Sequence, residues 1–212
     1  MPGRLVQVIV LVEDLEAARR WASGAGLLAL DGGRHPGRGT ANVIVPFGAE
    51  YLELLAVVDP DEAGASPDGR PVLDALAGRG PGPARWSLES DDVDAEGRRL
   101  ALPVERRERV RPDGEVIRWR AVGVNEAWAE PWRCAFMAWD DPSKHPARTA
   151  GRHPCGATGF AGVEVGVPDG GRARAWVGGA VPAGVVLHEG AGAGPFAVSV
   201  ATPDGPLPVD PG

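Results

Sequence analysis

The sequence has 212 residues, of which 43% are hydrophobic and 24% charged, the composition of a globular domain with a real core. Its net charge of −7 argues against a nucleic-acid partner, because proteins that bind nucleic acids carry basic patches. No apolar run reaches the roughly 18 residues of a membrane-spanning helix. Cys134 and Cys155 are too few for a disulfide framework, so we expect reduced thiols and a cytoplasmic protein.

The first segment with regular structure is the apolar stretch 5–12, which is typical of a buried strand rather than a signal peptide. Asp14 offers a helix N-cap, and the apolar spacing that follows predicts a helix ending near Gly24. The remaining elements expected in this part are a strand at 27–30, a loop at 31–39, and strands at 40–46 and 50–58.

The same order of elements returns after a Pro-, Gly- and Asp-rich stretch at 59–83, in which a short helix is expected at 72–77. The second unit is expected to contain a strand at 85–89, a helix from residue 91 or 92 to 102, a hairpin of strands 104–110 and 115–122, and a strand at 134–139. A third, shorter unit is expected to contain strands at 160–167, 184–188, 196–200 and 207–209, with a helix at 169–177.

An internal repeat supports this division. Three segments each combine a strand end, an acidic cap and an amphipathic helix: VLVEDLEAARR (10–20), LESDDVDAEGRR (88–99) and VGVPDGGRARAW (165–176). Their spacing of about 80 residues is what duplicated βαβββ modules would give.

Five segments resemble the vicinal oxygen chelate superfamily, and its glyoxalase-like branch in particular. They are RLVQVIVLVEDLEAA (4–18), GGRHPGRGTANVIVPFGAEYLELLAV (32–57), WSLESDDVDA (86–95), RPDGEVIRWR (111–120) and FMAWDDPSKHP (136–146). The resemblance implies an α+β fold whose paired βαβββ modules, 4–58 and 84–140 within residues 1–146, form a cup. Residues 158–212 would then be a shortened third module, which could extend the sheet, cover an edge or contribute to a homodimer.

In catalytic members of this superfamily, the cup holds a divalent metal that substrates chelate through two neighbouring oxygens. Its four ligands, usually His and Glu, come from the first and last strands of the two modules. Carried over to this sequence, these positions are Gln7, Glu53, Arg85 and Ala138. Arg stays protonated and Ala has no donor atom, whereas a zinc, manganese or iron site normally needs about three or four protein ligands. The resemblance therefore implies a degenerate site, and we expect neither a metal nor another cofactor.

Glu53 is the first candidate for a catalytic residue. Strand alternation puts Tyr51, Glu53 and Leu55 on one face, which the resemblance turns toward the cup. The alternative is an exposed strand carboxylate. Gln7 shares the cup face with Leu5 and Ile9 by the same alternation, either as a ligand-binding residue or as a structural hydrogen-bonding group.

Arg85 is the cation among the carried-over positions. It could recognise an anionic ligand, or it could balance the charge of Glu53 directly, in place of a metal. A direct pair predicts Arg85 and Glu53 within hydrogen-bond reach of each other.

Other candidates lie near the rim of the expected cup. His35, in the glycine-rich loop, could act as an acid or base on a lid, or could belong to an ordinary surface loop. Asn42 on the next strand, Trp139 in an aromatic wall and His145 after the last strand could contact a ligand. Core packing is the alternative for the tryptophans, and His153 and His188 are expected to be structural.

Three functions are compatible with these residues. The first is a glyoxalase-like protein that binds a small organic ligand in its cup with a degenerate metal site. The second is a metal-dependent lyase, isomerase or ring-cleaving dioxygenase. The third is a sequestering protein of the antibiotic-resistance type, which needs a cup and no catalysis.

Overall fold

The computed structural model describes residues 3–111, 113–149 and 151–212. The first module contains strand β1 (Arg4–Leu11), helix α1 (Leu15–Gly24) and strands β2 (Leu30–His35), β3 (Thr40–Pro46) and β4 (Tyr51–Val57). Asp14 caps α1 as the sequence predicts, since its side chain accepts a hydrogen bond from the backbone N–H of Glu16 at 2.8 Å.

Two helices, α2 (Pro60–Ala65) and α3 (Arg70–Arg79), separate the first module from the second. The second module consists of β5 (Gly82–Glu89), α4 (Val93–Leu100), β6 (Glu105–Val110), β7 (Val116–Val122), α5 (Val124–Ala129) and β8 (Ala135–Trp139). Pro112, in the segment expected to turn between β6 and β7, lies outside the described residues. The sequence predicted α3, but it predicted neither α2 nor α5, which are each only six residues long.

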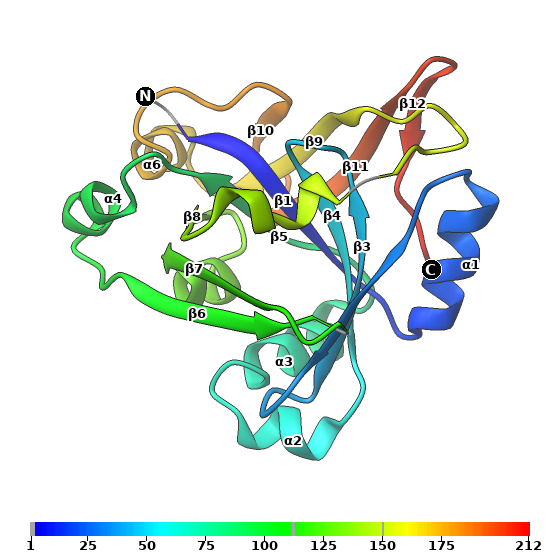
Figure 1. Cartoon of the computed structure of the whole chain (residues 1–212). Coiled ribbons are helices and arrows are strands. Elements are labelled where there is room, and N and C mark those ends of the chain that lie inside the picture. Colours follow the sequence, from blue (N-terminus) through cyan, green and yellow to red (C-terminus); the bar gives the residue numbers. More distant parts are fainter. Residues whose placement is uncertain (1–2, 112, 150) are drawn as a thin grey trace.

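The strands of both modules form one eight-stranded sheet in the order β2-β3-β4-β1-β5-β8-β7-β6. In each module the first strand pairs with the last in parallel, and β1 pairs with β5 in antiparallel fashion, which joins the two modules. The sheet curves until its edge strands β2 and β6 come into contact, so that it encloses a cup (Figure 1). The α+β fold with paired βαβββ modules is confirmed.

One expected loop is a strand. Residues 31–35 belong to β2 and pair with β3, and His35 lies opposite Thr40. The loop expected at 31–39 was therefore wrong for residues 31–35, so His35 lies on a strand and on neither a lid nor a surface loop. The glycines that suggested a loop have another role, because Gly32 lies next to a bulge at a point where a neighbouring side chain crosses the strand.

The C-terminal region forms a second sheet from β9 (Gly159–Val167), β10 (Val185–Glu189), β11 (Gly194–Thr202) and β12 (Gly205–Pro208), with α6 (Gly170–Trp176) after β9. Its order is β10-β9-β11-β12. Here the first strand pairs in parallel with the strand after the helix, unlike the first two modules. That this region is a shortened third module therefore stays a prediction, although its elements follow one another as expected.

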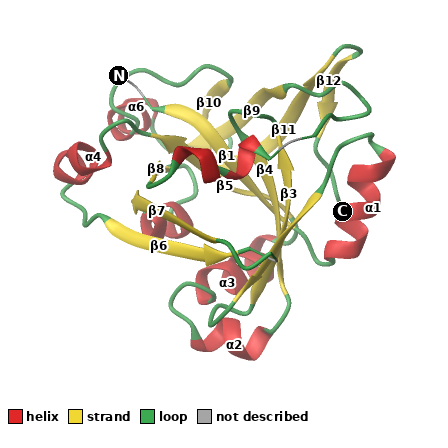
Figure 2. Cartoon of the chain, in the orientation of Figure 1, coloured by secondary structure: helices red, strands yellow, loops and turns green. Residues whose placement is uncertain are grey.

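The large sheet has an apolar outer face and a more polar inner face. Val8, Trp86 and Leu88 on the outer face share a core with Val165 and Val200 of the second sheet, which packs against β5 through β11. Helices α1 and α4 lie outside the cup on either side of this contact (Figure 2). No helix among residues 3–111, 113–149 and 151–212 has the length and apolar character to cross a bilayer.

Alternation along β1 and β8 departs from two expectations. A bulge between Leu5 and Gln7 turns Leu5 to the outer core, whereas Gln7 and Ile9 face the cup. On β8, Ala138 packs against the outer core and Met137 lines the cup. The assignment of Ala138 to an inward ligand position was therefore wrong, since neighbouring strand residues point to opposite faces.

Candidate functional site

The cup encloses about 830 Å³ of empty space, counting the part that is continuous with solvent at its mouth. The part of this space that the centre of a water-sized molecule can occupy is about 100 Å³, and the rest is the shell around the side chains and the open mouth. Its wall includes apolar and aromatic side chains from both modules, together with α3 and α5. The side chains that matter below are Gln7, His35, Arg38, Asn42, Tyr51, Glu53, Asp68, Arg85, Arg107, Arg109, Trp119, Trp128, Met137 and Trp139.

The floor of the cup is formed by Gln7, Asn42, Glu53, Arg85 and Arg109. Glu53 lies at its centre and is only 8% exposed. Strand pairing places it opposite Ile9 of β1 and Ile44 of β3, so that its diagonal neighbours on these strands are Gln7 and Asn42. Each amide donates to one carboxylate oxygen: Gln7 Nε2 to Oε2 at 2.5 Å and Asn42 Nδ2 to Oε1 at 2.7 Å. The buried carboxylate is thus held by two neutral donors.

The hydrogen bonds on the far side of each amide fix its orientation. Gln7 Oε1 accepts from Ser87 Oγ at 2.9 Å and from Arg85 Nη2 at 3.4 Å. Asn42 Oδ1 accepts from Arg109 Nη1 at 3.4 Å. Since each oxygen already faces a donor, each NH2 group must point to Glu53. The polar groups of the floor therefore form a row of hydrogen bonds in the order Arg85, Gln7, Glu53, Asn42 and Arg109.

Gly32 makes room for half of this arrangement. A Cβ at this position would lie 1.9 Å from Asn42 Oδ1 and 3.0 Å from Arg109 Nη1. Only glycine lets the Asn42 amide and Arg109 meet across β2 at the edge where the two modules come together.

Arg85 does not pair directly with Glu53. Its guanidinium contacts the Gln7 oxygen and lies over the ring of Trp128, with 5.2 Å between Cζ and the ring centroid. The side chain is buried, and its Nε–H has no hydrogen-bond partner among the described residues. The expected direct replacement of a metal by an Arg85–Glu53 pair was therefore wrong, because Gln7 occupies the space between the two charges.

Burial controls the charges of two groups facing the cup. Desolvation lowers the pKa of Arg85 to about 10, partly offset by attraction to Glu53, so the guanidinium stays charged at neutral pH. Desolvation also lowers the pKa of His35 to about 4, with Arg109 and Arg38 acting in the same direction and Glu53 opposing them. His35 is therefore neutral at pH 7, and its Nδ1 is hydrogen-bonded to Thr40 Oγ1 at 2.8 Å.

The structure brings most of the candidate residues together. Gln7, Asn42, Glu53 and Arg85 form the floor, and His35, Tyr51 and Trp139 line the same cavity. His145 is absent from the lining. Its ring packs behind Trp139 and Tyr51, with centroid distances of 4.9 and 5.8 Å, and its Nδ1 accepts from the Ala147 N–H.

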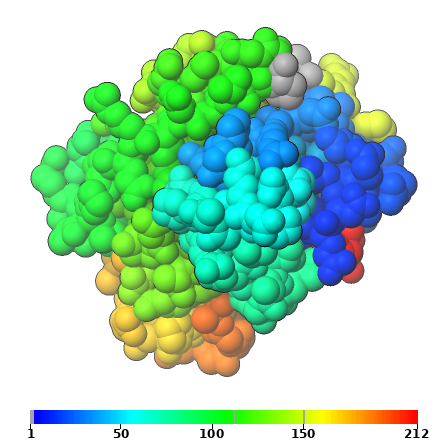
Figure 3. All heavy atoms as spheres, turned by 90° about the horizontal axis from the view of Figure 1, so that it is seen from below, coloured from blue at the N-terminus to red at the C-terminus, as the bar shows by residue number. Residues whose placement is uncertain are grey.

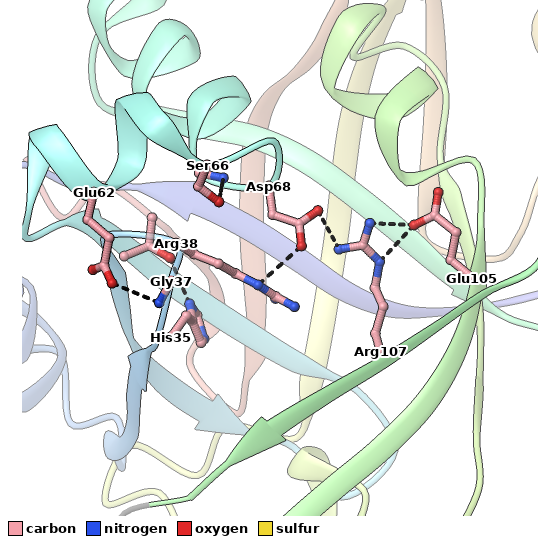
Figure 4. Close-up of polar contacts among 10 residues, drawn as sticks. His35, Gly37, Arg38, Glu62, Ser66, Asp68, Glu105 and Arg107 are labelled. Atoms are coloured by element: carbon pink, nitrogen blue, oxygen red, sulfur yellow. Dashed lines mark hydrogen bonds and ion pairs between the residues drawn. The ribbon is translucent and has the colours of Figure 1, made fainter.

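The mouth of the cup is lined by four charged side chains that form direct ion pairs: Arg38, Asp68, Glu105 and Arg107. Asp68, between α2 and α3, contacts Arg38 at 3.2 Å and Arg107 of β6 at 3.0 Å, and Arg107 also pairs with Glu105 (Figure 4). In the view from below, the cyan residues of α2 and α3 lie between the blue first module and the green second module (Figure 3). Glu62 of α2 anchors the β2–β3 turn by accepting from the N–H of Gly37 at 2.8 Å.

Sequence reasoning missed Arg107, Arg109 and Asp68 as lining residues, whereas Trp119 and Trp128 belong to the group of tryptophans from which a pocket wall was considered. A signal for the two arginines does exist, since ERRERV in β6 alternates between half-buried and exposed positions, with residues 107 and 109 on the half-buried side. Asp68 and Trp128 come from segments whose position over the cup depends on long-range packing.

The chemistry of the floor does not fit the divalent metal that the superfamily implies. Glu53 supplies one carboxylate whose two oxygens already accept amide N–H bonds. Gln7 offers an amide oxygen that is taken by two donors, and Arg85 brings a fixed positive charge to the same place. Among the described residues, no group of three or more His, Cys, Asp or Glu side chains is arranged to hold a metal ion.

The model of the family described as "Glyoxalase-like domain" matches residues 8–180, and the chain belongs to this family. A comparison with curated proteins found no match. A hypothetical protein from Staphylococcus aureus has a similar structure, with a TM-score of 0.61 and 13% identity over 95% of this chain and 82% of that one. Its similarity concerns the fold alone, and it extends over nearly the whole chain.

Structures of methylmalonyl-CoA epimerase are also among the similar ones. The enzyme from Mycobacterium tuberculosis has 20% identity and a TM-score of 0.45 over 65% of this chain and 86% of that one. A Streptomyces coelicolor epimerase in complex with 2-nitronate-propionyl-CoA has 18% identity and a TM-score of 0.46 over 66% of this chain and 97% of that one.

Proposed function

We propose that this protein binds a small organic ligand in its cup, in the cytoplasm, without a catalytic metal. The observation that carries the proposal is the floor, where a buried carboxylate and two arginines face a cavity and are kept apart by Gln7 and Asn42. A few convergent polar groups beside aromatic and apolar side chains are the usual pattern of a ligand site. A purely structural network would pair its charges directly, because isolated buried charges are costly.

The aromatic wall supports the same proposal. Trp119 and Trp139 pack on each other with ring centroids 5.3 Å apart, and both line the cavity. The Trp139 indole N–H is buried and has no acceptor among the described residues. Tyr51 lies nearby, and burial together with the charge of Glu53 raises the pKa of its phenol, which keeps it protonated. Flat indole rings suit a ligand with a planar body.

Any turnover in the cup would use Glu53 as its base. It is the carboxylate at the closed end of the cavity, and each of its oxygens keeps a lone pair beyond the amide bond. Neutral His35, at the β2 edge, would accept a proton rather than donate one. Binding itself requires neither step.

The indole N–H signals in an NMR spectrum can test the location of binding. Trp119, Trp128 and Trp139 line the cup, whereas Trp132 and Trp176 pack with the outer core and serve as internal controls. A fragment library should contain compounds that shift the first three signals and leave the other two unchanged, after assignment with Trp→Phe variants. The proposal fails if no fragment shifts the cup signals, or if the outer pair shifts instead.

A further inference from the structure

We infer that the ligand is a monoanion, a single carboxylate on a planar apolar body, which is held by Arg85 and Arg109. The inference rests on the proposed function and goes further by naming the charge and chemical class of the ligand. It follows from the charges of the cup, from the free donors of the arginines and from the wall.

The charges of the lining are the first argument. At the mouth, Arg38 and Arg107 are balanced by Asp68 and Glu105 through direct ion pairs. On the floor, Arg85 and Arg109 carry two positive charges and Glu53 carries one negative charge. One positive charge therefore remains at the closed end of the cup, where water is scarce and charge is expensive. One negative charge from the ligand cancels it, whereas a dianion would leave an excess next to Glu53.

The donors of the two arginines are the second argument. The amide oxygens hold Arg85 and Arg109 through long contacts, 3.4 Å each, which leave most of their N–H groups uncommitted. The Arg85 Nε–H has no partner at all among the described residues, although its side chain is only 9% exposed. A buried donor without an acceptor costs about 1–3 kcal/mol. The uncommitted N–H groups suit a carboxylate, since it accepts two parallel N–H bonds from one guanidinium.

The spacing amides explain why the arginines stay available. If Gln7 were absent, Arg85 could turn to Glu53 and form an internal pair, which would remove the binding charge. Gln7 is held in place by Ser87, so its NH2 group satisfies Glu53 and its oxygen only loosely engages Arg85. Asn42 does the same for Arg109, in the space that Gly32 leaves open.

The wall determines the rest of the ligand. Trp119 and Trp139 line the cavity on the β7–β8 side, and Met137 lies beside them on β8. Stacking on indole rings favours a flat apolar body, and sulfur packs well against aromatic edges. An arylcarboxylate combines both requirements.

The experiment measures affinity for matched probes by isothermal titration calorimetry. Each set shares one aromatic body and carries a carboxylate, a primary amide or two carboxylates, as in 2-naphthoate, 2-naphthamide and naphthalene-2,3-dicarboxylate. Acids should bind about tenfold or more tightly than their amides and than the diacids, since one charged hydrogen bond contributes roughly 1.5–3 kcal/mol. Arg85→Gln and Arg109→Gln should each bring the acid-to-amide ratio close to one, whereas exposed Arg118→Gln should leave it unchanged.

The outcomes separate the two proposals. If amides bind in the cup as tightly as acids, or diacids bind best, the monoanion inference is wrong and ligand binding stands. If no member of any set shifts the cup signals of the tryptophans, the monoanion inference is wrong, and the fragment library decides the proposed function separately. Arg109 is less buried than Arg85, so Arg109→Gln keeps the test valid if Arg85→Gln fails to fold.

Discussion

The floor and the mouth of the cup contain the same kinds of charged group but connect them differently. At the mouth, Asp68 contacts Arg38 and Arg107 directly, at 3.2 and 3.0 Å. On the floor, Glu53 contacts only amides, and each amide stands between it and an arginine. The mouth is partly exposed, with Asp68 at 32% side-chain exposure, whereas Glu53 is 8% exposed.

This difference shows which charged side chains are available to bind a ligand. Direct pairs in a half-exposed setting contribute little to stability, but they neutralise the arginines and connect the modules across the opening. On the buried floor, Gln7 and Asn42 separate Glu53 from Arg85 and Arg109, so these charges stabilise the fold less than direct ion pairs would. The two arginines therefore stay available to bind an anion. The two regions therefore divide the tasks of holding the cup together and holding its ligand.

Replacing the central carboxylate should have the largest effect. Glu53→Leu removes the acceptor of two buried amide N–H groups and the negative charge that faces Arg85 and Arg109 across those amides, so we expect a loss of about 3–5 kcal/mol in unfolding free energy. Urea denaturation gives this value. Glu108→Leu, at an exposed pair on β6, is the control and should change stability by less than about 1 kcal/mol. Equal effects of the two variants would mean that the floor is no more demanding than the surface.

Filling the gap at Gly32 should disturb the floor from one side. In Gly32→Ala the new methyl group overlaps Asn42 Oδ1, so the amide must turn away from Glu53 and Arg109. We expect a loss of about 1–3 kcal/mol, typical of overpacking, together with weaker binding of acids. Gly78→Ala is the matched control, because nothing lies within 4 Å of its Cβ position and alanine favours the helix α3. Unchanged stability and acid binding in Gly32→Ala would contradict the assigned role of Asn42.

The pH dependence of stability can test whether water is excluded around His145, whose ring packs behind Tyr51 and Trp139. Desolvation lowers its pKa from 6.5 to about 4, with help from Arg4 and Arg148. Between pH 6.5 and 4, His145 is therefore protonated in the unfolded chain and neutral in the folded chain. The unfolding free energy should fall as the pH drops through this range, and His145 should contribute about 1.4 kcal/mol per pH unit to the fall. His145→Asn keeps an acceptor for the Ala147 N–H and should remove this slope.

Stability curves for wild type and His145→Asn between pH 4 and 8 provide the check. The difference in unfolding free energy between wild type and His145→Asn should be constant above pH 7. It should become smaller or change sign as the pH is lowered toward 4. The carboxylates near the mouth act in a lower window, since the Arg34 hydrogen bond lowers the pKa of Glu62 and its contribution is lost only below the usual range of a glutamate. Parallel curves across the whole range would show that His145 is solvated.

Removing a charge at the mouth should have the smallest effect on stability. Asp68→Asn breaks two partly exposed ion pairs, but Arg107 keeps Glu105, so we expect a loss of about 1 kcal/mol or less. The variant should also bind diacids more tightly than wild type, because Arg38 loses its acidic partner and adds one uncompensated positive charge to the cup. A collapse of stability, or no gain in diacid affinity, would remove the distinction between mouth and floor.

The sequence predicted the paired modules because their signals are local and repeated. Each strand is followed by an acidic cap and an amphipathic helix, and Asp14 caps its helix as expected. Alternation also put Tyr51 and Glu53 on one face of β4, and the resemblance implied that this face is turned toward the cup, where both residues lie. By contrast, the glycines of β2 predict a loop, because nothing in the local sequence indicates that the Asn42 side chain crosses the strand at Gly32.

The hydrogen bonds of the floor could not be predicted to the same degree. The resemblance implied that Gln7, Glu53 and Arg85 lie together, but the bulge in β1 and the diagonal position of Gln7 decide that the amide lies between the charges. Arg109 comes from an edge strand that meets the first module only when the whole sheet curves. Asp68 lies outside any strand or helix, between α2 and α3, so nothing local indicates that it faces two arginines.

The central claim is that the floor arginines are free for a ligand and the mouth arginines are not. The most direct measurement is the acid-to-amide affinity ratio of one aromatic probe pair, compared between Arg85→Gln and Arg38→Gln. Our account predicts that Arg85→Gln lowers the ratio about tenfold or more, whereas Arg38→Gln leaves it within about twofold of wild type. Equal ratios in the two variants, or a loss confined to Arg38→Gln, would contradict the account.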